Sequence, residues 1–340
     1  MKKIKRKSNK KRLKRNNFKI LLLLLIISIT IAYCVNNNEI EKKANELTNN
    51  IVKKVDLKDE QSEHEKCLVS KYTNADMSEN LKNKIEELNA YLNNYNLSVY
   101  YEDITTGFTY KYKEEEVYYG ASLIKLVEAL YLIDKASTNE INLDTTTVKY
   151  LSKYKAEDSI GMDKRNIGEE VSLRDLISYA LKYSDNTAHF MLSEFIGISN
   201  LREYGKSLGA VNILTGGDSY GNQSASDTNI YLKHAYEIMQ KNTNYGAFLK
   251  ECMTNTYYNY LYLNEENNVA HKWGLHSIYF HDIGIVFEDN PYTLSILTTY
   301  GKNDYKTIVN NVSQKINELH HLFYSERENR CHQEIYNKKN

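Results

Sequence analysis

The stretch Tyr118-Tyr119-Gly120-Ala121-Ser122-Leu123-Ile124-Lys125 leads from a turn into an apolar segment that is predicted to be helical from about Ser122 to Ala136. Ser122 then lies at a helix start, where unpaired N–H groups and the positive dipole end favour negative charge. Lys125 follows three residues later on the same helix face, so its amine can reach the serine oxygen. Partial burial would lower the pKa of this amine and let it act as a base. Taken alone, such a pair is more often a capping serine beside a solvated lysine.

Two further motifs follow in order along the chain. Ser184-Asp185-Asn186 lies in a break between helices predicted over residues 172–183 and 186–196, the first of them capped by Ser172. Lys272-Trp273-Gly274 lies at the end of a strand predicted over residues 268–273. Each motif alone is weak evidence. Ser184-Asp185-Asn186, for example, also fits an ordinary loop that joins two helices. The ordered set of three is a strong signal for a serine acyl-transfer site.

The three motifs together resemble those of the penicillin-recognising serine hydrolases, and most closely those of class A β-lactamases. The resemblance implies a nucleophilic Ser122 with Lys125 as its base. It implies that Ser184 relays a proton to the leaving nitrogen and that Lys272 supplies positive charge for a substrate carboxylate. No Cys or His spacing suggests a metal site, and no cofactor is expected.

The substrate-binding residues are also given by the resemblance. It implies that Asn186 binds a substrate amide and supports the catalytic lysine, whereas Asp185 is structural. Gly274 would let the substrate backbone approach the strand edge. The backbone N–H groups of Ser122 and Leu275 would form the oxyanion hole. Trp273 departs from the family, which has Thr or Ser here, so a hydroxyl that would bind the substrate carboxylate is lost.

A second departure concerns the step that frees the acyl-enzyme. Class A β-lactamases carry a Glu between the second and third motifs that activates the hydrolytic water. The corresponding stretch, residues 215–227, contains no Glu. Asp218 is one carbon shorter, while Glu194 and Glu203 lie earlier on predicted helices and are expected at the surface. We therefore expect acylation without fast hydrolysis of a β-lactam acyl-enzyme.

The order of predicted elements agrees with the fold that this resemblance implies. A helix with an apolar stripe from Leu81 to Leu92 precedes strands over 97–103 and 108–112, which are joined by a turn ending at Gly107. A helical middle, three strands over 268–273, 280–287 and 292–299, and a helix with a stripe from Ile308 to Phe323 follow. We predict an α/β β-lactamase-like (DD-peptidase) sandwich over residues 77–328. It has a five-stranded antiparallel sheet flanked by helices, plus an all-helical half.

The N-terminal region has a separate organisation. Residues 1–19 carry eleven Lys or Arg and no acid, and an apolar run fills residues 20–35. This pattern predicts an uncleaved membrane anchor, a cleaved export signal or, through Cys34, a lipoprotein. The basic tail would stay in the cytoplasm, so the catalytic domain would be extracytoplasmic at the cell membrane, or secreted after cleavage. Residues 36–76 are expected to form a charged stalk, and 329–340 a tail.

Charge and cysteine content narrow the partners. Without the eleven basic residues of the tail, 33 basic residues remain against 44 acidic ones, a net charge of about −11. This acidic body argues against nucleic acid as a partner. The resemblance would let Cys67 and Cys331 pair if the terminal helices pack together; the alternative is separate free thiols.

The sequence therefore favours an anchored extracytoplasmic serine hydrolase that forms an acyl-enzyme on a β-lactam or on D-Ala peptide-type amides of the cell wall. Two departures from the family favour the peptide-type substrate: the absence of the Glu and the presence of Trp273. The overall resemblance of the motifs to class A β-lactamases favours the β-lactam. The alternatives are a non-hydrolysing penicillin-binding sensor or scaffold and a structural surface protein in which the motifs are accidental.

Overall fold

The computed structural model describes residues 61–339, except 158, 216–217, 242, 259, 262–267 and 301–304, together with residues 23, 24, 43, 46 and 47. The predicted basic tail, residues 1–19, lies outside the described residues. So do Cys34 and most of the apolar run and of the stalk. None of the described helices combines the length and the apolar character needed to cross a membrane. The chain divides into two compact units, Met1–Cys67 with His332–Asn340, and Leu68–Cys331.

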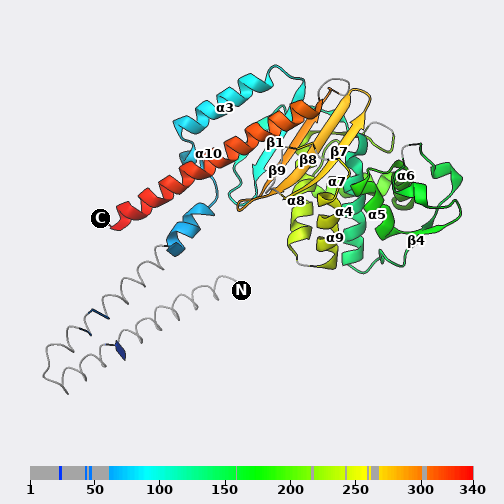
Figure 1. Cartoon of the computed structure of the whole chain (residues 1–340), viewed down its shortest axis with the longest axis horizontal. Helices are drawn as coiled ribbons and strands as arrows, with labels where there is room; N and C mark the ends of the chain where they lie inside the picture. The colour runs from blue at the N-terminus through cyan, green and yellow to red at the C-terminus, as the bar shows by residue number, and fades with distance from the viewer. Residues whose placement is uncertain are drawn as a thin grey trace. The chain divides into compact units, whose positions relative to one another are not determined.

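The order of elements in the described chain is shown in Figure 1. The α-helices are α3 (Glu79–Leu92), α4 (Ile124–Ser137), α5 (Leu173–Lys182), α6 (Asn186–Ile196), α7 (Ile198–Leu208), α8 (Ala225–Gln240), α9 (Asn244–Thr254) and α10 (Tyr305–Lys339). The 3-10 helices are η1 (Asn74–Asp76), η2 (Ala121–Leu123), η3 (Ser152–Tyr154) and η4 (Met162–Lys164). The strands are β1 (Leu97–Asp103), β2 (Thr109–Tyr112), β3 (Tyr118–Tyr119), β4 (Thr147–Lys149), β5 (Glu170–Ser172), β6 (Asn222–Gln223), β7 (Asn268–His276), β8 (Tyr279–Phe287) and β9 (Tyr292–Thr298).

A five-stranded sheet in the order β2-β1-β9-β8-β7 organises the larger unit, and every neighbouring pair is antiparallel. The turn between β1 and β2 has the chemistry predicted for it. The Asp103 carboxylate accepts hydrogen bonds from the N–H and the hydroxyl of Thr106, both at 2.6 Å. Gly107 has a φ of +78°, which a residue with a Cβ adopts only with strain. The predicted five-stranded antiparallel sheet is confirmed.

Helices α3 and α10 cover one face of this sheet (Figure 1). The α3 stripe predicted from the sequence is buried at Leu81, Leu88 and Leu92, and Ser78 caps the helix by accepting from the Leu81 N–H at 2.9 Å. α10 contributes a matching buried row along its inner side, consisting of Val309, Val312, Ile316, Leu319 and Phe323. Apolar residues three and four apart form one stripe, and that stripe faces the sheet.

The other face of the sheet is covered by the helical half, whose innermost helix is α4. Of its 14 residues, ten are buried, including Ile124, Leu126 and Leu130. A helix with most of its residues buried lies inside a core, with other elements around it, and here the buried set also includes the charged Lys125 and Glu128. Helices α5 to α9 surround α4 and are drawn on the same side of the sheet (Figure 1). This arrangement holds residue 122, at the start of α4, where the helical half meets the sheet.

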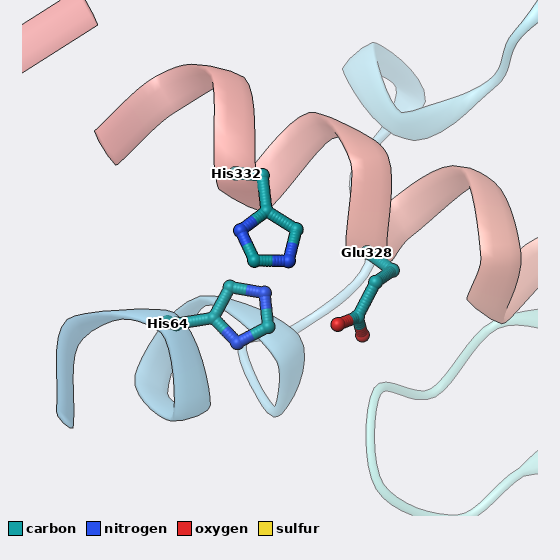
Figure 2. Close-up of side chains that lie close together, drawn as sticks. All are labelled: His64, Glu328 and His332. Carbon is teal, nitrogen blue, oxygen red and sulfur yellow. The ribbon is translucent and has the colours of Figure 1, made fainter. Parts of the chain in front are cut away.

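The smaller unit has described structure at both chain ends. Residues 61–67 are helical, and the His64 and His332 rings stack with centroids 4.2 Å apart. Figure 2 shows these rings, with Glu328 one turn before His332 on α10. The region predicted as a tail, 329–340, is helical as far as Lys339. Cys67 and Cys331 each take part in a disulfide, and Cys252 is the free thiol among the described cysteines.

Candidate active site

Ser122 lies in the short 3-10 helix η2, which runs directly into α4, so the predicted helix begins with a tighter turn than expected. Its neighbour Ala121 has a φ of +46°, a left-handed conformation that is rare for a residue with a side chain. Such strained positions persist where the surrounding structure enforces them, and they cluster at functional sites. The strained turn presents Ser122 with a side chain that is largely but not completely buried.

Lys125 is completely buried one turn after Ser122. Its Nζ donates to Ser122 Oγ at 2.9 Å, to the Ser184 carbonyl oxygen at 2.6 Å and to Asn186 Oδ1 at 2.7 Å. Burial lowers the pKa of Lys125 to about 7, although the negative charges of Glu128 and Asp185 oppose this shift. An amine with this pKa is partly neutral at physiological pH and can accept a proton from the serine hydroxyl.

The second motif forms the predicted break between α5 and α6. Ser184 is held at a φ of +56°, which turns the chain sharply. Asp185 caps α6 by accepting from the Ala188 N–H at 2.9 Å, and its second oxygen accepts from the Gly161 and Met162 N–H groups at 2.8 and 2.9 Å. The carboxylate of Asp185 therefore fixes the loop, as expected for a structural residue, while its neighbours reach Lys125.

Lys272 approaches the same site from β7. Its completely buried Nζ donates to Ser184 Oγ at 2.9 Å and to the Trp273 carbonyl oxygen at 2.5 Å. Burial, followed by repulsion from Lys125, lowers the pKa of Lys272 well below its usual value. Since Lys125 Nζ lies 3.3 Å from Ser184 Oγ, this hydroxyl is placed between two amines. Hydroxyls, an amide oxygen and two amines of lowered pKa suit proton transfer.

The strand that carries the third motif is longer than predicted. β7 continues to His276, so Gly274 and Leu275 lie inside the strand rather than after it. A Cβ at Gly274 would lie 3.0 Å from the Ser122 backbone nitrogen, so glycine lets the strand pack directly against the serine turn. Leu275 is exposed beside it. The half-buried Trp273 packs edge-on against Tyr258 and Tyr260, with ring centroids 5.3 and 6.0 Å away.

The structure adds Tyr220, a residue that the sequence analysis missed. Its hydroxyl donates to Asn186 Oδ1 at 3.2 Å, so the loop before α8 reaches the amide that also holds Lys125. Asp218 accepts from the Tyr220 and Gly221 N–H groups at 2.9 and 2.7 Å and so shapes this loop. A tyrosine in a loop carries no periodic signal, so no pattern in the sequence pointed to Tyr220.

The other acidic residues considered as replacements for the missing Glu are exposed. Glu194 pairs with Lys153 at 2.6 Å on the surface, and Glu203 is exposed on α7. His281 is buried on β8, within the strand predicted over residues 280–287, although its role toward the serine turn was not predicted. Its Nε2–H donates to the Tyr119 carbonyl oxygen at 2.8 Å, while its Nδ1 accepts from the Thr298 N–H at 3.1 Å. His281 thus holds the chain three residues before the serine, and burial lowers its pKa to about 4.

Comparison with known proteins agrees with the geometry. The model of the beta-lactamase enzyme family matches residues 80–319. No curated protein sequence matches the chain. Among solved structures, a PBP-A mutant in an acyl-enzyme complex with penicillin G has a TM-score of 0.62 at 18% identity, covering 70% of this chain and 95% of that one.

Two β-lactamases have similar folds. The TLA-3 extended-spectrum β-lactamase has a TM-score of 0.61 at 22% identity, covering 71% of this chain and 98% of its own. A β-lactamase from Sphaerobacter thermophilus has a TM-score of 0.61 at 14% identity, covering 71% of this chain and 96% of its own. At such low identities the likeness shows a shared fold, and the predicted β-lactamase-like architecture is confirmed.

Proposed function

This chain belongs to the beta-lactamase enzyme family, and on that premise we propose that it is an active-site serine hydrolase that works through an acyl-Ser122 intermediate. One observation carries the proposal: the completely buried Lys125 amine lies 2.9 Å from Ser122 Oγ, held by Ser184 and Asn186. A nucleophile within hydrogen-bond reach of a base that is itself oriented is the arrangement that covalent catalysis requires.

Acylation follows from these contacts. Neutral Lys125 takes the Ser122 hydroxyl proton while Oγ forms a bond to the substrate carbonyl carbon, and the carbonyl electron pair moves onto its oxygen. The backbone N–H groups of Ser122 and Leu275 stabilise that oxyanion. The pair then returns, the carbon–nitrogen bond breaks, and the leaving nitrogen takes the Ser184 hydroxyl proton. A proton from Lys125 or Lys272 restores Ser184, since both amines lie within 3.3 Å of its Oγ.

The substrate is an amide with a nearby carboxylate, either a β-lactam or a D-Ala peptide of the cell wall. Lys272 attracts the carboxylate, and Asn186 holds the acyl amide. Trp273 brings an aromatic surface in place of a hydroxyl, which favours substrates that depend less on a hydrogen bond to the carboxylate. The solved acyl-enzyme of PBP-A with penicillin G shows that the fold can hold such an ester.

Deacylation is expected to be slow. A positioned general base typically contributes 10²–10⁴-fold to a rate. The loop that reaches the site supplies Tyr220, and burial raises the pKa of this phenol, so it is a poor base near neutrality. A persistent acyl-enzyme also fits the second candidate, a penicillin-binding sensor that does not turn over. The basic residues 1–19 and the apolar run 20–35 support an extracytoplasmic site at the cell membrane.

The proposal is tested with purified full-length protein and a fluorescent penicillin, comparing wild type with Ser122→Ala. We expect covalent label on wild type that persists for minutes and no label on the variant, whose circular dichroism and melting temperature stay unchanged. Label that fades within seconds would indicate an efficient β-lactamase. Equal labelling of the folded Ser122→Ala variant would overturn the proposal. Slow turnover of a D-Ala-D-Ala peptide would identify the peptidase, and its absence with stable label would favour the sensor.

A further inference from the structure

A second acid–base pair lies buried behind the serine and its lysine. Glu128 is on α4, one turn after Lys125, and His189 is on α6. Their side chains have 0% exposure, and His189 Nδ1 lies 2.8 Å from Glu128 Oε1. Burying a carboxylate is costly unless it is paired or put to use, and apolar side chains could have filled this space. The mechanism described above does not use this pair.

The outer nitrogen of the histidine holds the loop that enters the site. His189 Nε2 lies 3.1 Å from Ser219 Oγ, and the His189 and Tyr220 rings have centroids 4.5 Å apart. Tyr220 in turn donates to Asn186 Oδ1, which accepts from Lys125. A continuous set of contacts thus runs from the buried pair through the loop to the catalytic amine.

Two anions, Glu128 and Asp185, favour the protonated form of Lys125, and Glu128 contributes more. Asp185, at the start of α6, is committed to three backbone N–H groups. Lys272, from β7, supplies no negative charge, and burial and repulsion from Lys125 lower its own pKa. Tyr220, from the loop, stays neutral because its pKa is raised. The second carboxylate oxygen of Glu128 has no hydrogen-bond partner among the described residues. Its charge is the largest electrostatic contribution that favours the protonated form of Lys125.

We propose that Glu128 and His189 are positioning residues of this site: the Glu128 charge sets the pH at which Lys125 releases its proton, and His189 seats Tyr220 against Asn186. In the tautomer with a proton on Nδ1, His189 donates a hydrogen bond from Nδ1 to Glu128 and accepts one at Nε2 from the Ser219 hydroxyl. One tautomer therefore serves both contacts. The pair thereby links proton release at the base to the seating of the loop. This inference rests on the proposed function, because it assigns roles toward the same serine and lysine.

The first test measures the protonation of Lys125 directly in the full-length protein. The ¹³Cε resonance of Lys125, assigned by its loss in Lys125→Arg, is followed against pH in wild type and in Glu128→Gln. Removing the charge while keeping the shape should lower the titration midpoint by about one pH unit. Glu194→Gln is the matched control, since it makes the same change on an exposed α6 residue, and its midpoint should equal that of wild type.

Two further variants keep the charge test decisive. Glu128→Asp retains the charge but withdraws it by one carbon, so the midpoint should fall by less than in Glu128→Gln. Should Glu128→Gln fail to fold, as judged by its melting temperature, the smaller fall in Glu128→Asp carries the test. A midpoint that stays at the wild-type value in the folded Glu128 variants would overturn the role of the charge.

The role of His189 is tested by a double-mutant cycle on acylation. His189→Asn keeps a donor for Glu128 but loses the contact to Ser219, and Ser219→Ala removes the same contact from the other side. Each should slow fluorescent-penicillin acylation several-fold while the Lys125 midpoint stays within a few tenths of the wild-type value. The double variant should be no slower than the slower single variant. Fully additive effects would overturn the loop contact.

The two readouts separate failure of this inference from failure of the proposed function. If wild type takes no label while Glu128→Gln still lowers the Lys125 midpoint, the electrostatic role stands and the substrate assignment is wrong. If wild type is labelled at Ser122 but neither the midpoint nor the pH profile of acylation moves in Glu128→Gln, the proposed function stands and the inference is overturned.

Discussion

At the scale of single residues, Lys125 shows how position alone changes chemistry. A solvated lysine is almost entirely charged at neutral pH, because its ordinary pKa is about 10.4. Enclosed by Ser122, Ser184 and Asn186, the same amine is completely buried and shielded from the bulk solvent that would stabilise its charge. The resulting pKa of about 7 comes from desolvation, and it suits the role of base near neutrality that we propose for this amine.

The pH dependence of acylation follows from this value. Neutral Lys125 is required, so the acylation rate should rise about tenfold per pH unit below pH 6.5 and level off above about pH 7.5. Stopped-flow labelling between pH 5 and 9 measures this profile. A rate that keeps rising towards pH 10 would mean that the amine titrates as a solvated lysine and is not the base.

Gly274 can pack against the serine turn because it has no Cβ. In Gly274→Ala, the added Cβ would meet the Ser122 backbone nitrogen at 3.0 Å and displace the serine turn. Small displacements of reacting groups are costly, so acylation should fall about tenfold or more, with only about 1 kcal/mol lost in stability. The control is Gly205→Ala on α7, where the new Cβ also meets a neighbour at 3.0 Å, here the Ile213 side chain. It should leave acylation unchanged, and equal loss of acylation in both variants would contradict a local effect.

The residues of this site were predicted because a family resemblance joined three short motifs, each of which has its own local spacing. Ser122 and Lys125 share one helix face, and Ser184 and Asn186 share one loop. In contrast, Tyr220 and His281 reach the site only through the tertiary packing of a loop and a strand. No spacing along the chain relates them to Ser122, so the sequence could not reveal their contacts.

At the scale of elements, two helix starts with the same capping chemistry differ in what depends on them. Ser172 caps α5 with one bond, accepting from the Asp175 N–H at 3.1 Å. The Asp185 cap of α6 also binds the Gly161 and Met162 N–H groups and is completely buried. α6 therefore starts at a point fixed from two sides, directly beside the residues that hold Lys125.

Removing each cap should separate stability from function. Asp185→Ala would leave three buried N–H groups unpaired, so the free energy of unfolding should fall by about 3 kcal/mol and acylation should slow sharply. Ser172→Ala should cost about 1 kcal/mol and leave acylation unchanged. Urea denaturation and fluorescent-penicillin labelling measure the two quantities. Normal labelling by Asp185→Ala would mean that the cap does not position the site.

The elements themselves were predicted with uneven success, for a physical reason. Long helices and sheet strands can be predicted from the periodic spacing of their apolar residues. The bounds of β1, Leu97–Asp103, and of α6, Asn186–Ile196, agree with the prediction. The short strands β3 to β6 were missed, since two or three residues carry no periodicity. The end of β7 was placed too early because Gly274 resembles a strand terminator, although here it serves close packing.

At the scale of the whole larger unit, Leu68–Cys331, the candidate site lies where the core around α4 meets the sheet. One core lies between the sheet and the helices α3 and α10, and the other surrounds α4. The serine turn belongs to the second core, and Lys272 reaches it from the sheet. Two of the buried histidines of this unit are His281, on strand β8, and His320, on helix α10.

These two histidines make the stability of the unit depend on pH. Burial lowers the pKa of both His281 and His320 to about 4. Between that value and about 6.5, the unfolded chain binds protons that the folded chain excludes, so stability falls as the pH falls through this window. Between pH 7 and pH 5 each histidine should contribute a loss of about 2 kcal/mol. Urea denaturation at the two pH values measures the total.

His281→Gln isolates one of the two contributions. Glutamine keeps a donor for the Tyr119 carbonyl oxygen but does not titrate, so the variant should lose about 2 kcal/mol less than wild type on acidification. Its stability at pH 7 need not match that of wild type, because the prediction concerns the difference between the two pH values. An unchanged difference would mean that His281 is protonated in the folded protein at pH 5. A protonated His281 would keep its Nε2–H donated to the Tyr119 carbonyl oxygen, but its Nδ1 could no longer accept from the Thr298 N–H, so acidification would weaken the contact between β8 and β9 rather than the serine turn.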